Sequence, residues 1–317
     1  MGSPHCSVVM PVYNGSRFLE AALQSILDQT EPDFELIAID DGSTDDTPSI
    51  LVRYSADPRL KIIRQAHSGL AASRNAGLKA ATSDLIINLD SDDIMASNRI
   101  ERQLTFMREN PAIAGAGSFY TIINEQGDDR GTVEAPWTTV DKLNLYLDHG
   151  GNPIYPNPTM IFRKSGALSV GGYREEYDRC EDVDLFLRML LARQYLLIQP
   201  EYLTFFRYHS SSSTATSGRR NFELGEILFF NFRRQRAGLP PISMHDYKEK
   251  ITHLSFLSKL CRESRYLSRY FLAGHGAALV RNEKMLAKLL LAGAAVCDPT
   301  ATINKVQRNI KYRQTDR

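Results

Sequence analysis

Hydrophobic residues in the first hundred positions follow two alternating spacings. Short apolar runs typical of buried strands cover residues 7–12, 34–39, 60–63 and 85–89. Between these runs, apolar residues recur every three or four positions, as on one face of a helix, most clearly over residues 18–27. Thr47-Pro48 opens a second helix, and Gly69 introduces a third. This alternation predicts an α/β fold, with a mostly parallel sheet covered by helices on both faces.

The pattern becomes less regular in the middle of the chain and changes again near its end. Further elements are predicted as helices over residues 98–108 and 181–191 and as strands over 159–163, 196–198 and 203–208. After Asn221 only helical spacing remains, with a break at residues 274–276. We therefore predict an α/β domain over residues 1–214 and an all-helical C-terminal region over residues 215–317. The Ser- and Thr-rich residues 210–217 are interpreted as a linker or as a loop over the site.

Composition supports a folded chain, and charge separates its two parts. Of the 317 residues, 43% are hydrophobic and 24% are charged, as in globular proteins. The net charge of +1 argues against a dedicated nucleic-acid binder. Residues 1–214 hold 19 basic and 29 acidic side chains (net −10), whereas residues 215–317 hold 19 basic and 8 acidic ones (net +11). The basic tail is expected to hold an anionic acceptor, lie on an anionic membrane surface, mediate homo-oligomer formation or simply pack on the acidic domain.

The scattered cysteines and the lack of a recognisable signal peptide favour a cytoplasmic location. The four cysteines show neither C-x-x-C pairing nor zinc-ligand spacing, which favours a reducing compartment. No signal peptide is recognisable, and the apolar stretch at residues 289–297 is far shorter than the roughly 20 residues of a membrane span. We expect a cytoplasmic protein whose only membrane contact is peripheral, at the inner face.

Polar and acidic residues follow three predicted strands, at the edge where ligands of such sheets bind. These positions are Tyr13-Asn14, Asp40-Asp41 and residues 90–93. Asp41 is either a turn residue or a carboxylate that accepts a hydrogen bond from an imide N–H or from ribose hydroxyls. Three strand ends that meet at one edge favour a binding site over three separate turns.

The cluster Asp90-Ser91-Asp92-Asp93 is the strongest single signal. Three carboxylates within four residues repel one another unless a cation or a solvated turn relieves them. Hard divalent ions such as Mg or Mn take oxygen ligands of this kind together with substrate phosphates. An EF-hand fails on spacing, because Met95 stands where the turn glycine is needed. The alternative is an acidic helix N-terminus without a ligand.

Three further positions carry candidate chemistry. Glu181 and Asp182 begin a predicted helix, where they either stabilise its dipole or offer a general base. Arg74 lines a base or diphosphate pocket or is a helix-surface arginine, and His209 is a metal ligand or a loop histidine. P-loop, dinucleotide-binding and nucleophile-elbow motifs are absent from the sequence. The hypotheses of a P-loop protein, a dinucleotide-binding enzyme and an esterase therefore lose their main support.

Six motifs, taken in order over residues 6–210, resemble the family-two inverting glycosyltransferases of the GT-A fold, and specifically their non-processive bacterial type. They are Pro11-Val12-Tyr13-Asn14, Asp40-Asp41-Gly42-Ser43-Thr44-Asp45, Arg74-Asn75-Ala76-Gly77, Asp90-Ser91-Asp92-Asp93, Gly171-Gly172-Tyr173 and residues 181–188. The resemblance implies that the domain over residues 1–214 binds a nucleotide sugar and catalyses its transfer. It stops near residue 215.

For the nucleotide, the resemblance implies that Pro11, Tyr13 and Asp41 frame the base, with Asp41 on uracil or its equivalent. Arg74 is expected near the base or the phosphates. Asp90 leads the D-x-D motif and supports the nucleotide-sugar site.

For metal and catalysis, the resemblance implies that Asp93 binds the Mn or Mg ion and that Asp92 meets the ribose and the metal. His209 fits the place of a late metal ligand. Asp182 is expected to be the catalytic base, with Glu181 beside it toward the acceptor.

The chain also departs from some members of the resembled family. The Q-x-x-R-W signature of processive polymerising members is absent, which favours addition of a single sugar. The expected reaction moves that sugar from a nucleoside-diphosphate sugar, with UDP favoured, to a glycan or lipid-linked acceptor in cell-surface polysaccharide synthesis. The alternatives are a nucleotidyltransferase and a catalytically inactive nucleotide-sugar-binding subunit.

Overall fold

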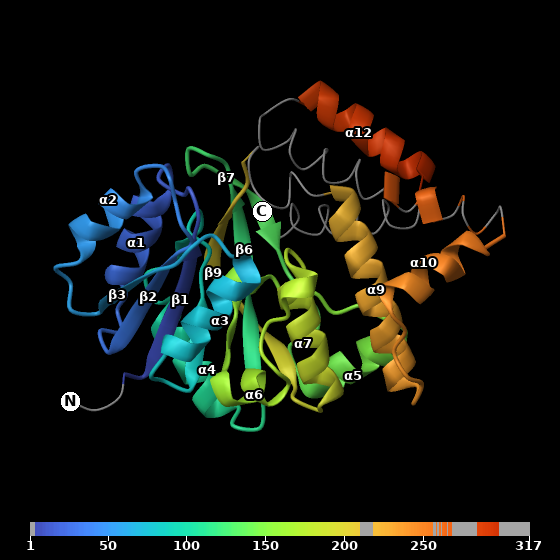
Figure 1. The fold of residues 1–317 in the computed structure, drawn as a ribbon, viewed down its shortest axis with the longest axis horizontal. Helices are drawn as coiled ribbons and strands as arrows, with labels where there is room; N and C mark the ends of the chain where they lie inside the picture. Colours follow the sequence, from blue (N-terminus) through green and yellow to red (C-terminus); the bar gives the residue numbers. More distant parts are fainter. Residues whose placement is uncertain are drawn as a thin grey trace, which may run out of the picture. The chain divides into compact units, whose positions relative to one another are not determined.

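The computed structural model describes residues 4–209, 218–255, 258, 260, 262–264, 266–267 and 284–297. Within them, nine strands form one sheet in the order β3-β2-β1-β4-β8-β6-β9-β5, and β7 pairs with β6 (Figure 1). The strands are β1 Cys6–Val12, β2 Phe34–Asp40, β3 Leu60–Arg64, β4 Leu85–Asn88, β5 Ile94–Met95, β6 Gly115–Ile123, β7 Asp129–Val133, β8 Ile161–Arg163 and β9 Leu196–Arg207.

The first four strands confirm the predicted parallel sheet. Strand β1 is parallel to β2 and to β4, and β2 is parallel to β3. The other half of the sheet is antiparallel, since β8 runs against β4 and β6. The 3₁₀ helix η1 (Asn157–Thr159) begins beside the carboxyl end of β4, where Asn88 Nδ2 donates to Asn157 Oδ1 at 2.7 Å. Strand β8 therefore starts at the edge where β4 ends and runs back.

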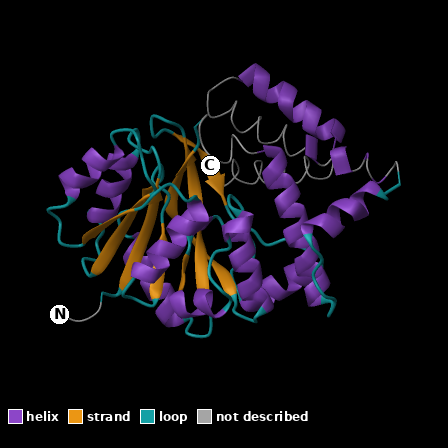
Figure 2. Ribbon diagram, viewed as in Figure 1, coloured by secondary structure: helices purple, strands orange, loops and turns teal. Residues whose placement is uncertain are grey.

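Helices lie on either side of the strands (Figure 2). They are α1 Leu19–Leu27, α2 Thr47–Tyr54, α3 Leu70–Ala80, α4 Arg99–Glu109, α5 Val140–Asp148, α6 Lys164–Ser169 and α7 Glu181–Leu191, with the 3₁₀ helix η2 Glu175–Tyr177. Helix α3 packs on β1 and β2. Gly77 permits this approach, because a Cβ there would lie 2.4 Å from Val9 Cγ1. Strand β1 is buried along its whole length and forms the centre of the core.

The chain divides into two compact units. The first comprises Met1–Ile122, Gly131–Arg207 and Leu228–Pro240, and the second Ile123–Arg130, Tyr208–Ile227 and Pro241–Arg317. Helix α9 (Gly218–Arg236) is divided between the units, and its residues from Leu228 onward belong to the first. There, Arg236 donates to Leu147 O and Arg233 to Asn152 Oδ1, each at 2.7 Å.

The helical C-terminal region is confirmed by α9, α10 (Met244–Thr252) and α12 (Lys284–Cys297). The predicted linker at residues 210–217, which includes the domain boundary at 214/215, and the predicted break at residues 274–276 lie outside the described residues. The division at residue 214 therefore stays a prediction. No helix in the described part of the chain is long and apolar enough to cross a bilayer.

Candidate active site

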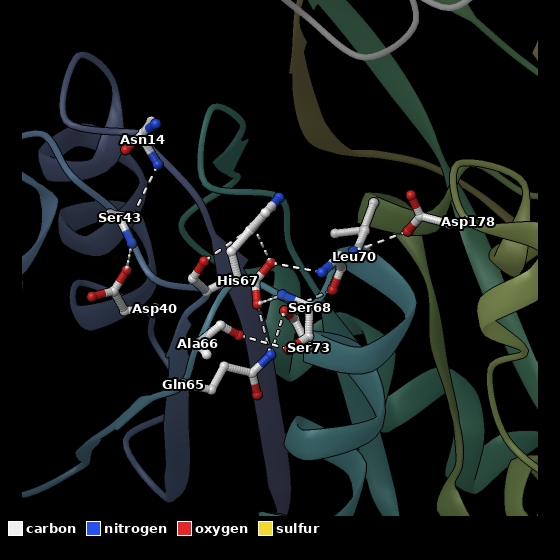
Figure 3. A network of polar contacts seen from close by, with 12 residues as sticks. Asn14, Asp40, Ser43, Gln65, Ala66, His67, Ser68, Leu70, Ser73 and Asp178 are labelled. Carbon is white, nitrogen blue, oxygen red and sulfur yellow. Dashed lines mark hydrogen bonds and ion pairs between the residues drawn. The ribbon is translucent and has the colours of Figure 1, made fainter.

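The ends of β1 and β2 meet in register, as expected from the parallel sheet. Val12 pairs with Asp40, and the Asp41 N–H donates to Val12 O at 2.9 Å. The following turns are joined by side chains. Asn14 Oδ1 accepts from Thr44 N at 2.8 Å. Asn14 N donates to Ser43 Oγ at 3.0 Å (Figure 3). Two of the three predicted strand ends are thus joined at one edge of the sheet.

Asp41 is held by the loop between β3 and α3. Its Oδ1 accepts from Gln65 Nε2 at 2.7 Å and from Ser68 N at 2.9 Å, and its Oδ2 accepts from Gly69 N at 2.9 Å (Figure 3). Partial burial alone would raise the pKa of Asp41, but these hydrogen bonds outweigh it and lower the pKa below its ordinary value. Asp41 is therefore a fixed carboxylate anion.

An exposed aromatic stack stands beside Asp41. The rings of Tyr13 and His67 lie 3.9 Å apart between centroids, with 20° between their planes. Tyr13 is 47% exposed, whereas Pro11 is buried in β1. His67 was not among the predicted site residues. The signal that points to it is its position after β3, whose end lies beside the ends of β1 and β2 in the parallel sheet.

Arg74 joins the two acidic motifs. Its side chain, 3% exposed, donates through Nη2 to Asp90 Oδ1 at 2.9 Å and forms an ion pair through Nη1 with Glu181 Oε1. Asp90 follows β4 and Glu181 begins α7, so one buried guanidinium connects segments about ninety residues apart in sequence. The predicted contact of Arg74 with the nucleotide stays a prediction.

The first turn of α7 presents two carboxylates in a desolvated setting. Burial raises the pKa of Glu181 to about 7 against the opposing effect of Arg74. Burial also raises the pKa of Asp182, whose Oδ1 accepts from Val183 N at 2.7 Å. A carboxylate with a raised pKa is a stronger base than one in water, which suits it to accept a proton near neutral pH.

Arg207, at the end of β9, fixes the acidic turn after β4. Its N–H donates to Asp93 Oδ1 at 2.7 Å, and its Nε donates to Asp92 O at 2.8 Å. Asp93 Oδ2 is buried and has no hydrogen-bond partner among the described residues. Burial, together with Asp92 and Asp90, raises the pKa of Asp93. This buried carboxylate oxygen can therefore accept a further ligand.

The predicted metal ligands are divided between the two units. Within the described ranges, no group of three or more His, Cys, Asp or Glu side chains is arranged to hold an ion. His209 is buried and belongs to the second unit, whereas Asp92 and Asp93 belong to the first. The role of His209 as a metal ligand stays a prediction.

Buried polar residues outside the predicted set position the site. Arg99 is fully buried and donates to Asn88 O at 3.0 Å and to Pro158 O at 2.6 Å, which joins the end of β4 to the loop before β8. Burial lowers the pKa of Arg99 to about 9. Asp178 accepts from Leu70 N at 3.0 Å and so caps α3 from the segment that leads into α7 (Figure 3).

The Gly-Gly-Tyr turn packs between α3 and α7. Asn75 of α3 forms two hydrogen bonds with the main chain of Tyr173, at 2.7 and 3.0 Å. Arg188 of α7 donates to Gly172 O at 2.6 Å and pairs with Asp184 at 2.6 Å. Asp184, 1% exposed and paired with both Arg174 and Arg188, is therefore structural.

The family model for glycosyl transferase family 2 matches residues 7–168 of the chain, a range that includes Asp41, Arg74 and residues 90–93. The chain belongs to this family. An uncharacterized glycosyltransferase of Haemophilus influenzae is 32% identical over 244 residues, which cover 75% of this chain and 92% of that protein. The putative teichuronic acid biosynthesis glycosyltransferase TuaG of Bacillus subtilis is 36% identical over 126 residues, covering 39% and 50%.

Other matches are partial or structural. An uncharacterized glycosyltransferase of Rickettsia conorii is 43% identical over 121 residues, so the match spans 38% of this glycosyltransferase and only 20% of that relative. The crystal structure of S. aureus TarS 1–349 in complex with UDP-GlcNAc has a TM-score of 0.59 at 17% identity, covering 95% of this chain and 91% of that TarS 1–349 chain. This likeness confirms the GT-A fold.

Proposed function

We propose that this glycosyltransferase transfers a single sugar, with inversion, from a nucleoside-diphosphate sugar to a hydroxyl of a glycan or lipid-linked acceptor. We favour UDP as the nucleotide. We favour cell-surface polysaccharide synthesis as the process, because TuaG is named for the biosynthesis of teichuronic acid. The observation that carries the proposal is the bridge formed by Arg74. It brings the acidic turn after β4 and the carboxylate pair of α7 to one site.

The donor side of the site rests on Pro11, Tyr13 and Asp41. The half-exposed ring of Tyr13 offers a stacking surface for a base, and the anionic Asp41 next to it offers an acceptor for an imide N–H. Uracil supplies both a flat ring and such an N–H. TarS, which has a similar fold, was crystallised in complex with UDP-GlcNAc, and this supports a nucleotide-sugar donor here.

A divalent cation, Mn or Mg, fits the acidic turn. The support is the buried Oδ2 of Asp93, which lacks a partner among the described residues, in a donor set of carboxylate oxygens. Asp93 and Asp92 would hold the ion. When bound, the ion neutralises charge on the departing diphosphate.

The chemical step is assigned to Asp182. The acceptor hydroxyl gives its proton to the Asp182 carboxylate as its oxygen bonds to the anomeric carbon. The bond from that carbon to the diphosphate oxygen breaks, and the nucleoside diphosphate leaves with the electron pair. Attack opposite to the leaving group inverts the anomeric configuration. Glu181, paired with Arg74, stands beside the base toward the acceptor.

Product analysis tests the proposed reaction. The full chain is incubated with Mn²⁺ and each of several nucleotide sugars, with and without a bacterial glycolipid fraction as acceptor. We expect slow release of UDP that the acceptor accelerates, with no pyrophosphate. Pyrophosphate release would instead indicate nucleotidyl transfer, and tight nucleotide binding without turnover would indicate an inactive binding subunit.

The basic residues 215–317, net +11, are proposed to hold the anionic acceptor at the inner membrane face. Flotation of the full chain with anionic vesicles at low and at high salt tests this part separately. Binding that salt weakens would support the proposal. No binding at either salt concentration would contradict the membrane contact and leave acceptor binding or self-association as the role of the tail.

A further inference from the structure

One side chain, His67, contacts both residues assigned to the nucleobase. Its ring covers Tyr13 at 3.9 Å between centroids, nearly parallel to it. Its Nδ1 lies 2.8 Å from Asp41 Oδ2 and 3.2 Å from Asp41 O. Because both facing atoms are acceptors, Nδ1 carries the hydrogen and donates it. A flat nitrogen heterocycle with an N–H toward Asp41 therefore already occupies this position.

The acceptor capacity of Asp41 is used in the same arrangement. Among the described residues, Gln65 and Ser68 donate to Oδ1, while Gly69 and His67 face Oδ2. Two carboxylate oxygens offer about four acceptor positions in all. The N–H of an incoming base therefore competes with these donors for Asp41.

His67 is the donor best able to leave. Ser68 and Gly69 donate from the main chain, and Ser68 and Gly69 immediately precede α3, whose N-terminus Asp178 caps (Figure 3). The His67 side chain is 55% exposed, so rotation about its χ angles moves the ring into solvent. The same rotation uncovers the face of Tyr13.

We propose that the His67 imidazole occupies the nucleobase position in the free enzyme and that the pyrimidine of a nucleoside diphosphate displaces it. The inference rests on the proposed function, since it needs Tyr13 and Asp41 to bind the base. Displacement lowers the apparent affinity by the fraction of enzyme in which the ring covers the site. Return of the ring after transfer promotes release of the nucleoside diphosphate product.

Calorimetric titration with two probes tests the displacement. UDP has a base, and inorganic pyrophosphate has none. Both are titrated with Mn²⁺ into the wild type, His67→Ala, His67→Phe and the control His5→Ala. His5 is a similarly exposed histidine paired with Glu31 and Asp33 at the opposite end of β1. Thermal unfolding checks that every variant folds.

We expect His67→Ala to bind UDP about tenfold more tightly, because a stacked ring and an imidazole nitrogen 2.8 Å from the Asp41 carboxylate no longer compete. His67→Phe keeps the stack and loses the hydrogen bond, so its gain is smaller. Pyrophosphate affinity stays unchanged in all variants, and His5→Ala matches the wild type for both probes.

Unchanged or weaker binding of UDP to His67→Ala would overturn the inference, since His67 would then be a bystander or a platform under the base. An equal change for UDP and pyrophosphate would overturn it as well. If the wild type and the variants all fail to bind UDP, the proposed function fails first and the inference falls with it.

Discussion

Removal of the Arg74 guanidinium tests the bridge at the centre of the site. In Arg74→Met, the new side chain has a similar length and apolar stem but no charge. Glu181, 1% exposed, then lacks its cation, and its Oε2 already has no hydrogen-bond partner among the described residues. Breaking a buried pair from one side costs about 3–5 kcal/mol.

Protonation of Glu181 reduces this loss. Burial raises the pKa of Glu181 to about 7 even with Arg74 in place, and loss of the cation raises it further. At pH 6 the carboxyl of Arg74→Met is already neutral, whereas at pH 8 its neutralisation costs free energy, at about 1.4 kcal/mol per pH unit. We expect a loss in unfolding free energy of about 3 kcal/mol at pH 8 and about 1–2 kcal/mol less at pH 6.

Urea denaturation followed by tryptophan fluorescence measures this loss. Trp137, the single tryptophan, is buried in the first unit together with Arg74. Arg53→Met is the control, since the pair of Arg53 with Glu20 is exposed and contributes less than about 1 kcal/mol. The double variant Arg74→Met with Glu181→Gln should recover about 2 kcal/mol at pH 8. A loss no larger than that of Arg53→Met would refute the buried bridge.

Three other perturbations follow from particular contacts. Asp93→Asn should abolish the extra thermal stabilisation that Mn²⁺ gives in the presence of UDP, and full retention of that Mn²⁺ effect would argue against Asp93 as a ligand. Gly172→Ala should lower the urea-derived stability by about 2 kcal/mol, because φ is +67° and a Cβ would lie 2.9 Å from Asn75 Oδ1. Gly171→Ala, at φ +92° with open space around the Cβ, should lose about 1 kcal/mol, and equal losses would contradict the role of the close contact. The folded protein keeps the Glu181 proton up to about pH 7, while the unfolded chain releases it near 4.5, so wild-type stability should fall by up to about 3 kcal/mol as pH rises between these values. Glu181→Gln should flatten this part of a stability–pH curve, and an unchanged slope would assign it to other groups.

The sequence predicted the parallel half of the sheet because its strands are short, apolar and separated by regular helices. It missed β6, Gly115–Ile123, whose first four residues are Gly, Ala and Ser and give little strand signal. A Cβ at Gly115 would lie 2.6 Å from Ile161 O, so this strand depends on close approach to a distant neighbour. Two predicted strands are joined in β9, since Pro200 is exposed and does not end the strand there.

At the site, the sequence predicts which residues are candidates better than it predicts which of them contact one another. Strand ends and helix starts identify Asp41, Asp90 and Glu181 as candidates, because acidic residues gather there in the sequence. That Arg74 lies between Asp90 and Glu181 depends on the packing of α3 on β1 and β2, which local spacing does not encode. The position of His67 after β3 marks it only as a strand-end residue, and its contacts with Tyr13 and Asp41 are visible only in the structure.

The assignment of Asp182 as the base of sugar transfer is tested most directly by Asp182→Asn, with Asp141→Asn, an exposed acid in the first turn of α5, as the matched control. Asparagine keeps the acceptor for Val183 N, so we expect normal folding and wild-type affinity for UDP. UDP release from the nucleotide sugar in the presence of acceptor should fall at least about 100-fold, as for loss of a general base, and stay unchanged in Asp141→Asn. Transfer by Asp182→Asn within a few-fold of the wild-type rate would contradict the account.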